Sequence, residues 1–399
     1  MKKIRIYHFN NGTNGGTFSV VKNLLKYSQN PQIENHVIYT INKEVATNFS
    51  ISPLEGAASQ NVFYYSPKWN FYYTCKQLAK LLPDVNAIVV AHDWLELGMV
   101  STMGIQNPVV HFVHGNYDYY YDLASKHERS TDQFITVSPV IYNKLCLIIP
   151  QRKKDIHYCR FPVPECLIAK KKNKILQIIY CVRSLEDENK QFKILPQINA
   201  KLKLKGIIVY WTIVGEGIAI EKIQAWMEQQ VGISLLPFLL NEDVINLLPK
   251  FDLFILPSLL EGFPVSVVEA MKAGVVPLVT NWQGATEELI ISGETGFYFK
   301  PGDVDGYSDK IDLLNADRKL LNQLSEKGKE RSNKLFDPYV NSKKIEVILV
   351  NANICVKKIK KPFKVYGSRL DHPLLSNLAV TMARKFQFYF FRLFLNSHF

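Results

Sequence analysis

Short runs of apolar, mostly β-branched residues alternate with amphipathic stretches along most of this chain. The runs that we expect to be buried strands are 4–7, 87–91, 109–113, 134–137, 176–182, 207–214, 253–256 and 275–280. The segments between these runs, such as 18–27, have apolar residues at the spacing of a helix. Continuous apolar strands that alternate with helices are typical of parallel sheets covered on both faces. The alternation therefore predicts an α/β fold.

The length of the chain and one stiff segment predict a division into two domains. A chain of 399 residues exceeds the size of one ordinary core. The alternation breaks over 156–164, where the stiff segment Arg-Phe-Pro-Val-Pro at 160–164 suits a connection between domains. We therefore expect Rossmann-like domains at 1–160 and 166–335, facing a central cleft beyond the carboxyl ends of their strands.

Charge and cysteine usage limit the partners and the compartment. The 48 Lys and Arg outnumber the 36 Asp and Glu, so the net charge is +12, which favours an anionic partner. The six cysteines form no Cys-x-x-Cys pair, and no stretch of eighteen uncharged apolar residues occurs. We expect a cytoplasmic protein, and a peripheral position on the inner face of a membrane stays open.

The residues from 356 to 399 differ from the rest. Lysines cluster over 357–364, and 374–395 is rich in Phe, Leu and Tyr. These features predict a basic, aromatic helical tail. Two interpretations are open: the tail docks on an anionic membrane surface through 357–399, or it packs on the rest of the protein.

The stretch 256–271 carries the most chemical information. An apolar strand ends there, a loop with Gly262 follows, and Pro264 stands where a helix would start. The first N–H groups of such a helix are free to bind a phosphate. Glu261 and Glu269 flank this turn, and a carboxylate can accept hydrogen bonds from two neighbouring sugar hydroxyls. The alternative is a surface Glu261 and a salt-bridged Glu269.

This stretch resembles the Glu-x7-Glu signature of retaining GT-B glycosyltransferases, in particular glycosyltransferase family 4 (glycosyl transferases group 1). Segments in the order typical of that family occur at 213–217, 281–289, 292–297 and 301–303. The resemblance covers residues 1 to about 335. It implies a GT-B fold with an acceptor-side first domain, a second domain that binds a nucleotide sugar, and a helix at 336–355 that returns towards the first domain.

The resemblance also implies roles for single residues. Arg183 and Lys190 would hold the donor diphosphate, where fixed cations offset the charge that develops on the leaving group. Glu261 would contact the hydroxyls of the donor sugar, Glu269 the ribose, and the loop at Asn241 the base. The rest of the donor-binding set is Gly262, Phe263 and Pro264.

In the first domain, three residues match the family. Gly15 and Gly16 match its Gly-rich loop, where backbone approaches the phosphates, although a plain turn would look the same. His114 matches the histidine under the donor sugar; with Glu261, Arg183 and Lys190 it completes the predicted catalytic set. A lone histidine at a strand end is more often structural, and only its place in this series of motifs favours catalysis.

The sequence departs from the family at some positions. Val182 stands where the family usually has glycine, and Ala285 replaces the second glycine of a Gly-Gly turn. The pair Asp303 and Asp305 has the spacing of a metal-binding Asp-x-Asp, but it follows a Pro-Gly pair and is interpreted as a turn. No cofactor and no metal are expected.

Together these observations predict a retaining, metal-independent hexosyltransferase. It would move a sugar from a nucleoside diphosphate donor, UDP-linked by preference, to a hydroxyl of a cell-surface glycan, such as a lipopolysaccharide or capsule, or of a lipid-linked acceptor. The alternative is a nucleotide-sugar-binding protein with weak or no turnover that acts as a partner or regulator. Nucleic acid is not an expected partner, because no nucleic-acid-binding motif accompanies the lysine clusters.

Overall fold

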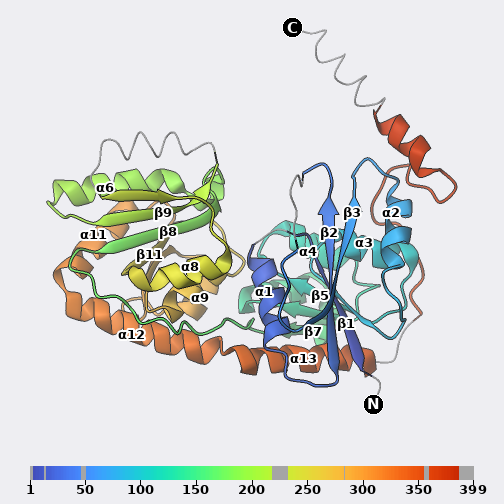
Figure 1. The fold of residues 1–399 in the computed structure, drawn as a ribbon, viewed down its shortest axis with the longest axis horizontal. Coiled ribbons are helices and arrows are strands. Elements are labelled where there is room, and N and C mark those ends of the chain that lie inside the picture. The colour runs from blue at the N-terminus through green and yellow to red at the C-terminus, as the bar shows by residue number, and fades with distance from the viewer. Residues whose placement is uncertain are drawn as a thin grey trace, which may run out of the picture.

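The computed structural model describes residues 3–12, 15–45, 51–217, 232–282, 284–354 and 359–385. Two lobes, one from each half of the chain, lie side by side (Figure 1). Each lobe has a parallel sheet at its centre, as the alternation of strands and helices predicts. The predicted α/β fold is therefore confirmed.

The first domain contains a seven-stranded sheet in the order β3-β2-β1-β4-β5-β6-β7. Each adjacent pair of strands is parallel. The strands are β1 (Ile4–Asn10), β2 (Ile33–Asn42), β3 (Ala57–Tyr65), β4 (Ile88–Ala91), β5 (Val109–Val113), β6 (Gln133–Thr136) and β7 (Ile156–Tyr158). The helices are α1 (Gly16–Lys26), α2 (Phe71–Ala79), α3 (Trp94–Met103), α4 (Asp118–Lys126) and α5 (Pro139–Ile148).

The second domain repeats this topology with six parallel strands in the order β10-β9-β8-β11-β12-β13. The strands are β8 (Gln177–Ser184), β9 (Tyr210–Glu216), β10 (Ile233–Leu236), β11 (Leu253–Leu256), β12 (Val276–Thr280) and β13 (Phe297–Phe299). The helices are α6 (Leu195–Leu204), α8 (Asn241–Leu247), α9 (Val265–Lys272), α10 (Ala285–Leu289), α11 (Val304–Ala316) and α12 (Arg318–Leu335). The order third-second-first-fourth-fifth-sixth in both sheets is that of the Rossmann fold.

The last long helix, α13 (Pro338–Ile354), belongs to the first lobe. It packs against α1, β4 and β5, and Glu346 accepts hydrogen bonds from the Ser28 hydroxyl and the Gln29 N–H. Figure 1 shows α12 along the second domain and α13 continuing along the first. The chain thus crosses between the domains twice.

The junction of the two domains is an aromatic cluster with one buried cation. The rings of Phe161, Phe263 and Phe336 pack against one another with centroids 5.2–5.8 Å apart. Beside them the ammonium of Lys272, 1% exposed, donates to the carbonyls of Val163 and Phe336. Both crossings of the chain are thereby fixed at one place, and this junction sets the position of the loop that contains Phe263.

Asp303 and Asp305 differ from the predicted turn. The Asp303 side chain accepts a hydrogen bond from the Gly306 N–H at 2.8 Å and caps α11, and Asp305 lies in the first turn of that helix. Acidic residues stabilise the N-terminus of a helix. The pair is therefore a helix start rather than a plain turn. In the described part of the chain, no group of three or more His, Cys, Asp or Glu side chains is placed to hold a metal ion.

Candidate active site

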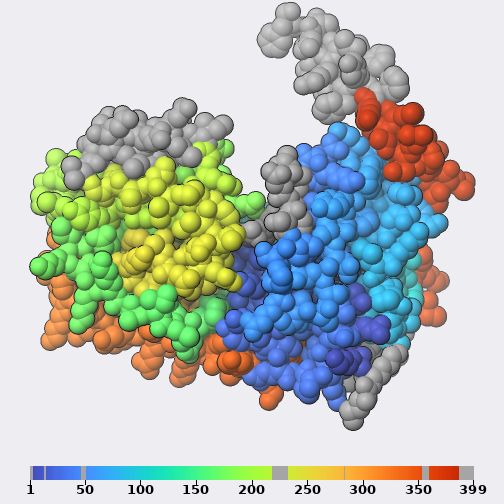
Figure 2. Space-filling model, in the orientation of Figure 1, coloured from blue at the N-terminus to red at the C-terminus, as the bar shows by residue number. Residues whose placement is uncertain are grey.

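The carboxyl ends of the two sheets face each other across a cleft. Figure 2 shows the notch between the lobes. At its base the loops of the two domains nearly touch: a Cβ added to Gly262 would lie 2.3 Å from the His114 carbonyl oxygen and 2.5 Å from Gly115 Cα. Tyr117 closes the same contact, because its hydroxyl donates to the Leu260 carbonyl at 3.1 Å. Gly262 therefore permits an approach that a side chain would block.

On the second domain, Lys190 and Glu261 form an ion pair. The Lys190 ammonium lies 2.6 Å from the Glu261 carboxylate, and their side chains are 24% and 12% exposed. Asn189 holds the same loop, because its amide donates to the Leu260 carbonyl and accepts from the Leu260 N–H. The structure thus brings together two predicted site residues that are 71 positions apart in the sequence.

Arg183 lies at the end of β8 with an exposed side chain. It has no hydrogen-bond or ion-pair partner in the part of the chain that the structure describes. A guanidinium at the carboxyl end of a parallel strand is available to an anionic ligand. Unlike Lys190, Arg183 is therefore positioned without an internal counter-ion.

Glu269 is buried on α9. Its side chain is 5% exposed and accepts a hydrogen bond from the Asn241 amide at 2.8 Å. Burial raises the pKa of Glu269 to about 7. Asn241 was predicted to lie near the base; in the structure its side chain orients the carboxylate that was predicted to bind the ribose.

Replacing Glu269 by glutamine is expected to stabilise the protein above neutral pH. The pKa of Glu269 is about 7 in the folded state and 4.5 as an ordinary value, so the folded state holds a proton that the unfolded state releases. The free energy of unfolding of the wild type therefore falls as pH rises from about 4.5 to about 7. Glu269→Gln removes this penalty, about 3 kcal/mol above neutral pH.

Urea unfolding of the wild type and Glu269→Gln at acidic and alkaline pH checks this expectation. Glu326, exposed on α12, provides the matched control Glu326→Gln. A stability difference between Glu269→Gln and the wild type that stays constant with pH would contradict the assignment.

The N-termini of α1 and α9 meet across the cleft. Gly16 begins α1 and Val265 begins α9, and a Cβ on Gly16 would lie 3.5 Å from Val265 Cγ2. Neither helix has a side-chain cap or an acidic residue in its first turn. A Cβ on Gly15, at the N-cap of α1, would meet nothing within 4 Å. The partial positive charges of two helix ends therefore point at one space, which suits an anionic ligand.

His114 enters the cleft from the loop after β5 and contacts a second histidine. His92 Nδ1 lies 2.7 Å from His114 Nε2. Burial lowers the pKa of His114 to about 4 and that of His92 well below its ordinary value. Both rings are therefore uncharged at neutral pH, and one proton lies between them. Among the described residues, none forms a hydrogen bond with His114 Nδ1.

The aromatic segment after His114 forms the first-domain side of the cleft. Tyr119 donates its hydroxyl to Asp93, and the rings of Tyr117 and Tyr119 pack against Tyr120. Asp93 also begins α3 as its N-cap. Aromatic side chains with polar ends are suited to contact the apolar faces of sugar rings.

Two predicted residues contribute differently from the others. Phe263 is 8% exposed and packs in the junction cluster, so any contact with a ligand comes from its backbone. Pro264 is the N-cap residue of α9 and precedes its free N–H groups. Residue 283 of the 281–289 motif lies outside the described residues.

The links between these residues were not predicted from the sequence. The contact between His92 and His114 follows from the adjacency of β4 and β5, whose carboxyl ends they extend. The pairing of those strands was the signal that could have predicted it. No local signal predicts the hydrogen bonds of Asn189 or Tyr117 to Leu260.

The second domain is similar to a known family. Residues 167–331 match the family model described as glycosyl transferases group 1. The capsular polysaccharide biosynthesis glycosyltransferase CapM of Staphylococcus aureus is 24% identical over 234 residues, 56% of this chain and 60% of that protein. The UDP-Gal:alpha-D-GlcNAc-diphosphoundecaprenol alpha-1,3-galactosyltransferase of Escherichia coli is 28% identical over 141 residues, 35% of each chain. The aligned part of this chain thus spans less than two thirds of the length of these relatives.

The fold extends the similarity to both domains. The crystal structure of Anabaena HepE in complex with UDP superposes with a TM-score of 0.68 at 15% identity and covers 88% of this chain and 100% of that one. At this identity the likeness concerns the fold. The predicted GT-B architecture and the resemblance to a glycosyltransferase family are confirmed.

Proposed function

We propose that this chain, whose second domain belongs to the glycosyl transferases group 1 family, is a retaining glycosyltransferase. It moves a hexose-type sugar from a nucleoside diphosphate, UDP by preference, to a hydroxyl of a cell-surface glycan or lipid-linked acceptor. The observation that carries the proposal is the convergence of Arg183, Lys190 and two uncapped helix ends on a single cleft that His114 enters from the other side.

The donor fits this arrangement by charge. The diphosphate lies against the N-termini of α1 and α9, with Arg183 and Lys190 as fixed cations. The carboxylates of Glu261 and Glu269 accept hydrogen bonds from sugar and ribose hydroxyls. The choice of UDP takes support from the name of the E. coli relative, a UDP-Gal enzyme, and the lipid-linked acceptor takes support from the same name.

In the reaction, the bond between the anomeric carbon and the diphosphate oxygen breaks on the face that the acceptor hydroxyl approaches. The bonding electrons leave with the diphosphate, and Lys190 and the helix ends stabilise the charge that develops there. The acceptor oxygen bonds to the anomeric carbon, and its proton passes to a diphosphate oxygen. No metal is required in this scheme, because these cations hold the leaving group.

Binding of nucleotide sugars tests the proposal. We expect UDP-sugars to raise the melting temperature of the wild type more than GDP- or ADP-sugars do. Arg183→Ala and Glu269→Ala should each weaken that binding by about tenfold or more, because each removes a charge-assisted contact.

Slow release of free sugar by the wild type adds evidence of turnover. Binding without any release would support the alternative, a nucleotide-sugar-binding protein. No stabilisation by any nucleotide sugar would overturn the proposed function.

A further inference from the structure

The residues from 359 to 385 form a strap across the first domain. The strap begins at the amino ends of the strands, where Lys360 contacts Asp132 at 2.5 Å and the Asn107 carbonyl at 2.6 Å. It then follows α3, where the Phe363 N–H donates to the Ser101 carbonyl and Pro362 packs against Gly104.

Tyr366 carries the strap to the other edge of the sheet. Its hydroxyl lies 2.9 Å from His127 Nε2, and its ring packs edge-on against Phe71 and Trp94. Phe71 and Trp94 begin α2 and α3, which follow the carboxyl ends of β3 and β4. The strap therefore ends beside the loops that form the first-domain side of the cleft.

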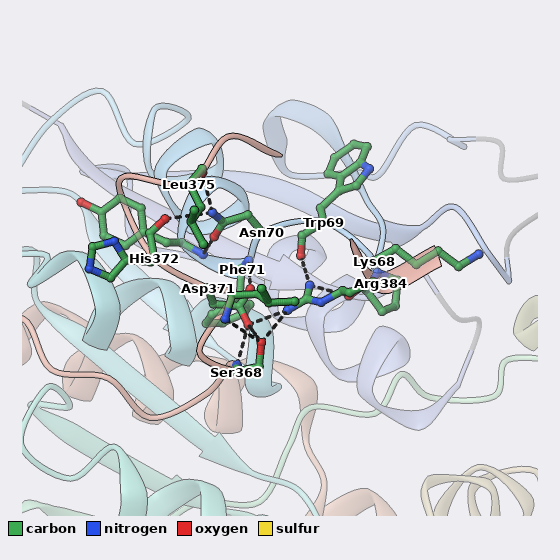
Figure 3. Close-up of polar contacts among 12 residues, drawn as sticks. Lys68, Trp69, Asn70, Phe71, Ser368, Asp371, His372, Leu375 and Arg384 are labelled. Atoms are coloured by element: carbon green, nitrogen blue, oxygen red, sulfur yellow. Dashed lines mark hydrogen bonds and ion pairs between the residues drawn. The ribbon is translucent and has the colours of Figure 1, made fainter. Parts of the chain in front are cut away.

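A polar network fixes the end of the strap (Figure 3). Asp371 accepts from the Phe71 N–H at 2.6 Å and pairs with Arg384, also at 2.6 Å. Arg384 in turn donates to the carbonyls of Pro67 and Trp69. Asn70 donates from its amide to the carbonyls of His372 and Leu375, and the Asn70 N–H donates to Asn377 Oδ1. The final helical segment, 377–385, is thus bound to the domain along one face.

The opposite face of that segment is apolar and exposed. Val380 faces the domain and is 1% exposed, whereas Leu378 and Met382, one helical turn apart, are 66% and 52% exposed. Leu374, just before the helix, is 87% exposed. A helix held by one face that exposes large apolar side chains on the other needs a partner.

The chain beyond Glu346 is strongly basic. Beyond Glu346 the sequence has one acidic residue, Asp371, and Arg384 already neutralises it. The basic residues there are Lys357, Lys358, Lys360, Lys361, Lys364, Arg369, Arg384, Lys385 and Arg392. Residues 357, 358 and 386–399 lie outside the described residues, but the sequence 386–399 contains Phe, Tyr and Leu at most positions and no acid.

We propose that the outer face of the 377–385 helix docks on the anionic surface of a lipid bilayer. Leu378 and Met382 enter the boundary of the acyl chains, and the exposed Arg369 and Lys385 lie among the headgroups. A bilayer fits better than a protein partner, because the aromatic and basic composition continues through the following residues without an acid. In the described residues no helix is both long and apolar enough to cross a membrane.

Docking here would place the first-domain side of the cleft next to the membrane. The strap end binds residues 67–71, Phe71 stacks on Trp94, and Asp93 precedes Trp94 at the cleft. The benefit of placing the cleft near the membrane rests on the proposed function, in which the acceptor is lipid-linked. The docking itself needs neither donor nor acceptor.

Cosedimentation of the full chain with vesicles tests the proposal. We expect binding to vesicles of phosphatidylcholine and phosphatidylglycerol, and little binding to phosphatidylcholine alone. Binding should weaken as salt is added, because the attraction between lysines and headgroups is screened. Leu378→Gln/Met382→Gln should weaken it by about tenfold or more, because both side chains lose their apolar burial.

The matched control is Leu204→Gln/Ile208→Gln. These side chains are 89% and 67% exposed at the end of α6 and just beyond it, in the other domain. The control should bind vesicles as the wild type does, and both double variants should keep the wild-type melting temperature. Equal binding of the two double variants, or equal binding to neutral vesicles, would overturn the proposal. Because the assay contains no nucleotide sugar, its failure would leave the proposed function standing.

Discussion

Lys190→Met is expected to lower the rate of sugar transfer between about a hundredfold and a thousandfold. In the proposed reaction the ammonium offsets the charge that develops on the departing diphosphate, and the loss of one such fixed donor has an effect of this size in other enzymes. The lysine lies 2.6 Å from Glu261, so its position is set before the donor binds. The rate should be measured with the nucleotide sugar that stabilises the wild type most.

The neighbouring Lys193 gives a matched control for this substitution. It lies three residues away and forms an exposed ion pair with Glu188, at 3.4 Å, with side chains 79% and 85% exposed. Exposed pairs of this kind contribute little to stability. Lys193→Met should therefore transfer sugar at nearly the wild-type rate, and equal rates in the two variants would contradict the role of Lys190.

A folding defect needs to be separated from a catalytic one. Lys190→Met leaves the carboxylate of Glu261, 12% exposed, without its cation. Lys190→Met/Glu261→Gln removes both charges and restores a neutral loop. If the double variant regains the wild-type melting temperature but not the rate, the pair of Lys190 and Glu261 acts in catalysis and not only on the fold. Recovery of the rate in the double variant would show that the pair acts only on the fold.

The central strands of both sheets could be predicted because burial leaves a continuous apolar signal. β11 (Leu253–Leu256) and β12 (Val276–Thr280) are buried at each position, and the sequence shows them as uninterrupted runs. β2 (Ile33–Asn42) was missed although 37–41 is a continuous buried run; only its first half, with Glu34, Asn35 and His36, lacks the apolar signal. β3 (Ala57–Tyr65) was missed because it is an edge strand and largely half-exposed, so its residues need not be apolar.

The residue types of the candidate site were predictable, but their contacts were not. Motif order alone indicates Arg183, Lys190, Glu261 and Glu269. The ion pair between Lys190 and Glu261 depends on the turn that Asn189 fixes through Leu260, and such a turn leaves no pattern in the sequence. Its formation needs the folded loop, because the partners come from different strand ends.

The contacts of the C-terminal tail were also not predictable, because they join residues that are far apart in the sequence. Its composition predicts a basic and aromatic segment, and both packing and membrane docking were left open. The structure favours packing for one face, since Asn70 binds residues more than 300 positions away. Contacts between such distant residues have no periodic signal. The exposed face keeps the second interpretation as a proposal.

Gly262→Ala is expected to lower kcat by about a hundredfold while the KM for the donor changes little. The new Cβ would lie 2.3 Å from the His114 carbonyl oxygen, closer than atoms approach without a shift. This oxygen and the next nearest atom, Gly115 Cα, belong to the backbone of the other domain. The two loops must therefore separate by about 1 Å. A displacement of that size between reacting groups can cost about a hundredfold in rate. Arg183, Lys190 and Glu269 lie on the second domain, so most donor contacts should persist, and only the contact with the N-terminus of α1 is weakened.

Tyr117→Phe separates this steric effect from the loss of a polar contact. It removes the hydrogen bond from the Tyr117 hydroxyl to the Leu260 carbonyl and adds no atom between the domains. We expect it to lower kcat only a few-fold, about the effect of one neutral hydrogen bond. If Gly262→Ala raised the donor KM as strongly as it lowered kcat, the loop would act on donor binding within its own domain. If kcat were unchanged, the close approach of Gly262 to His114 would have no part in the reaction.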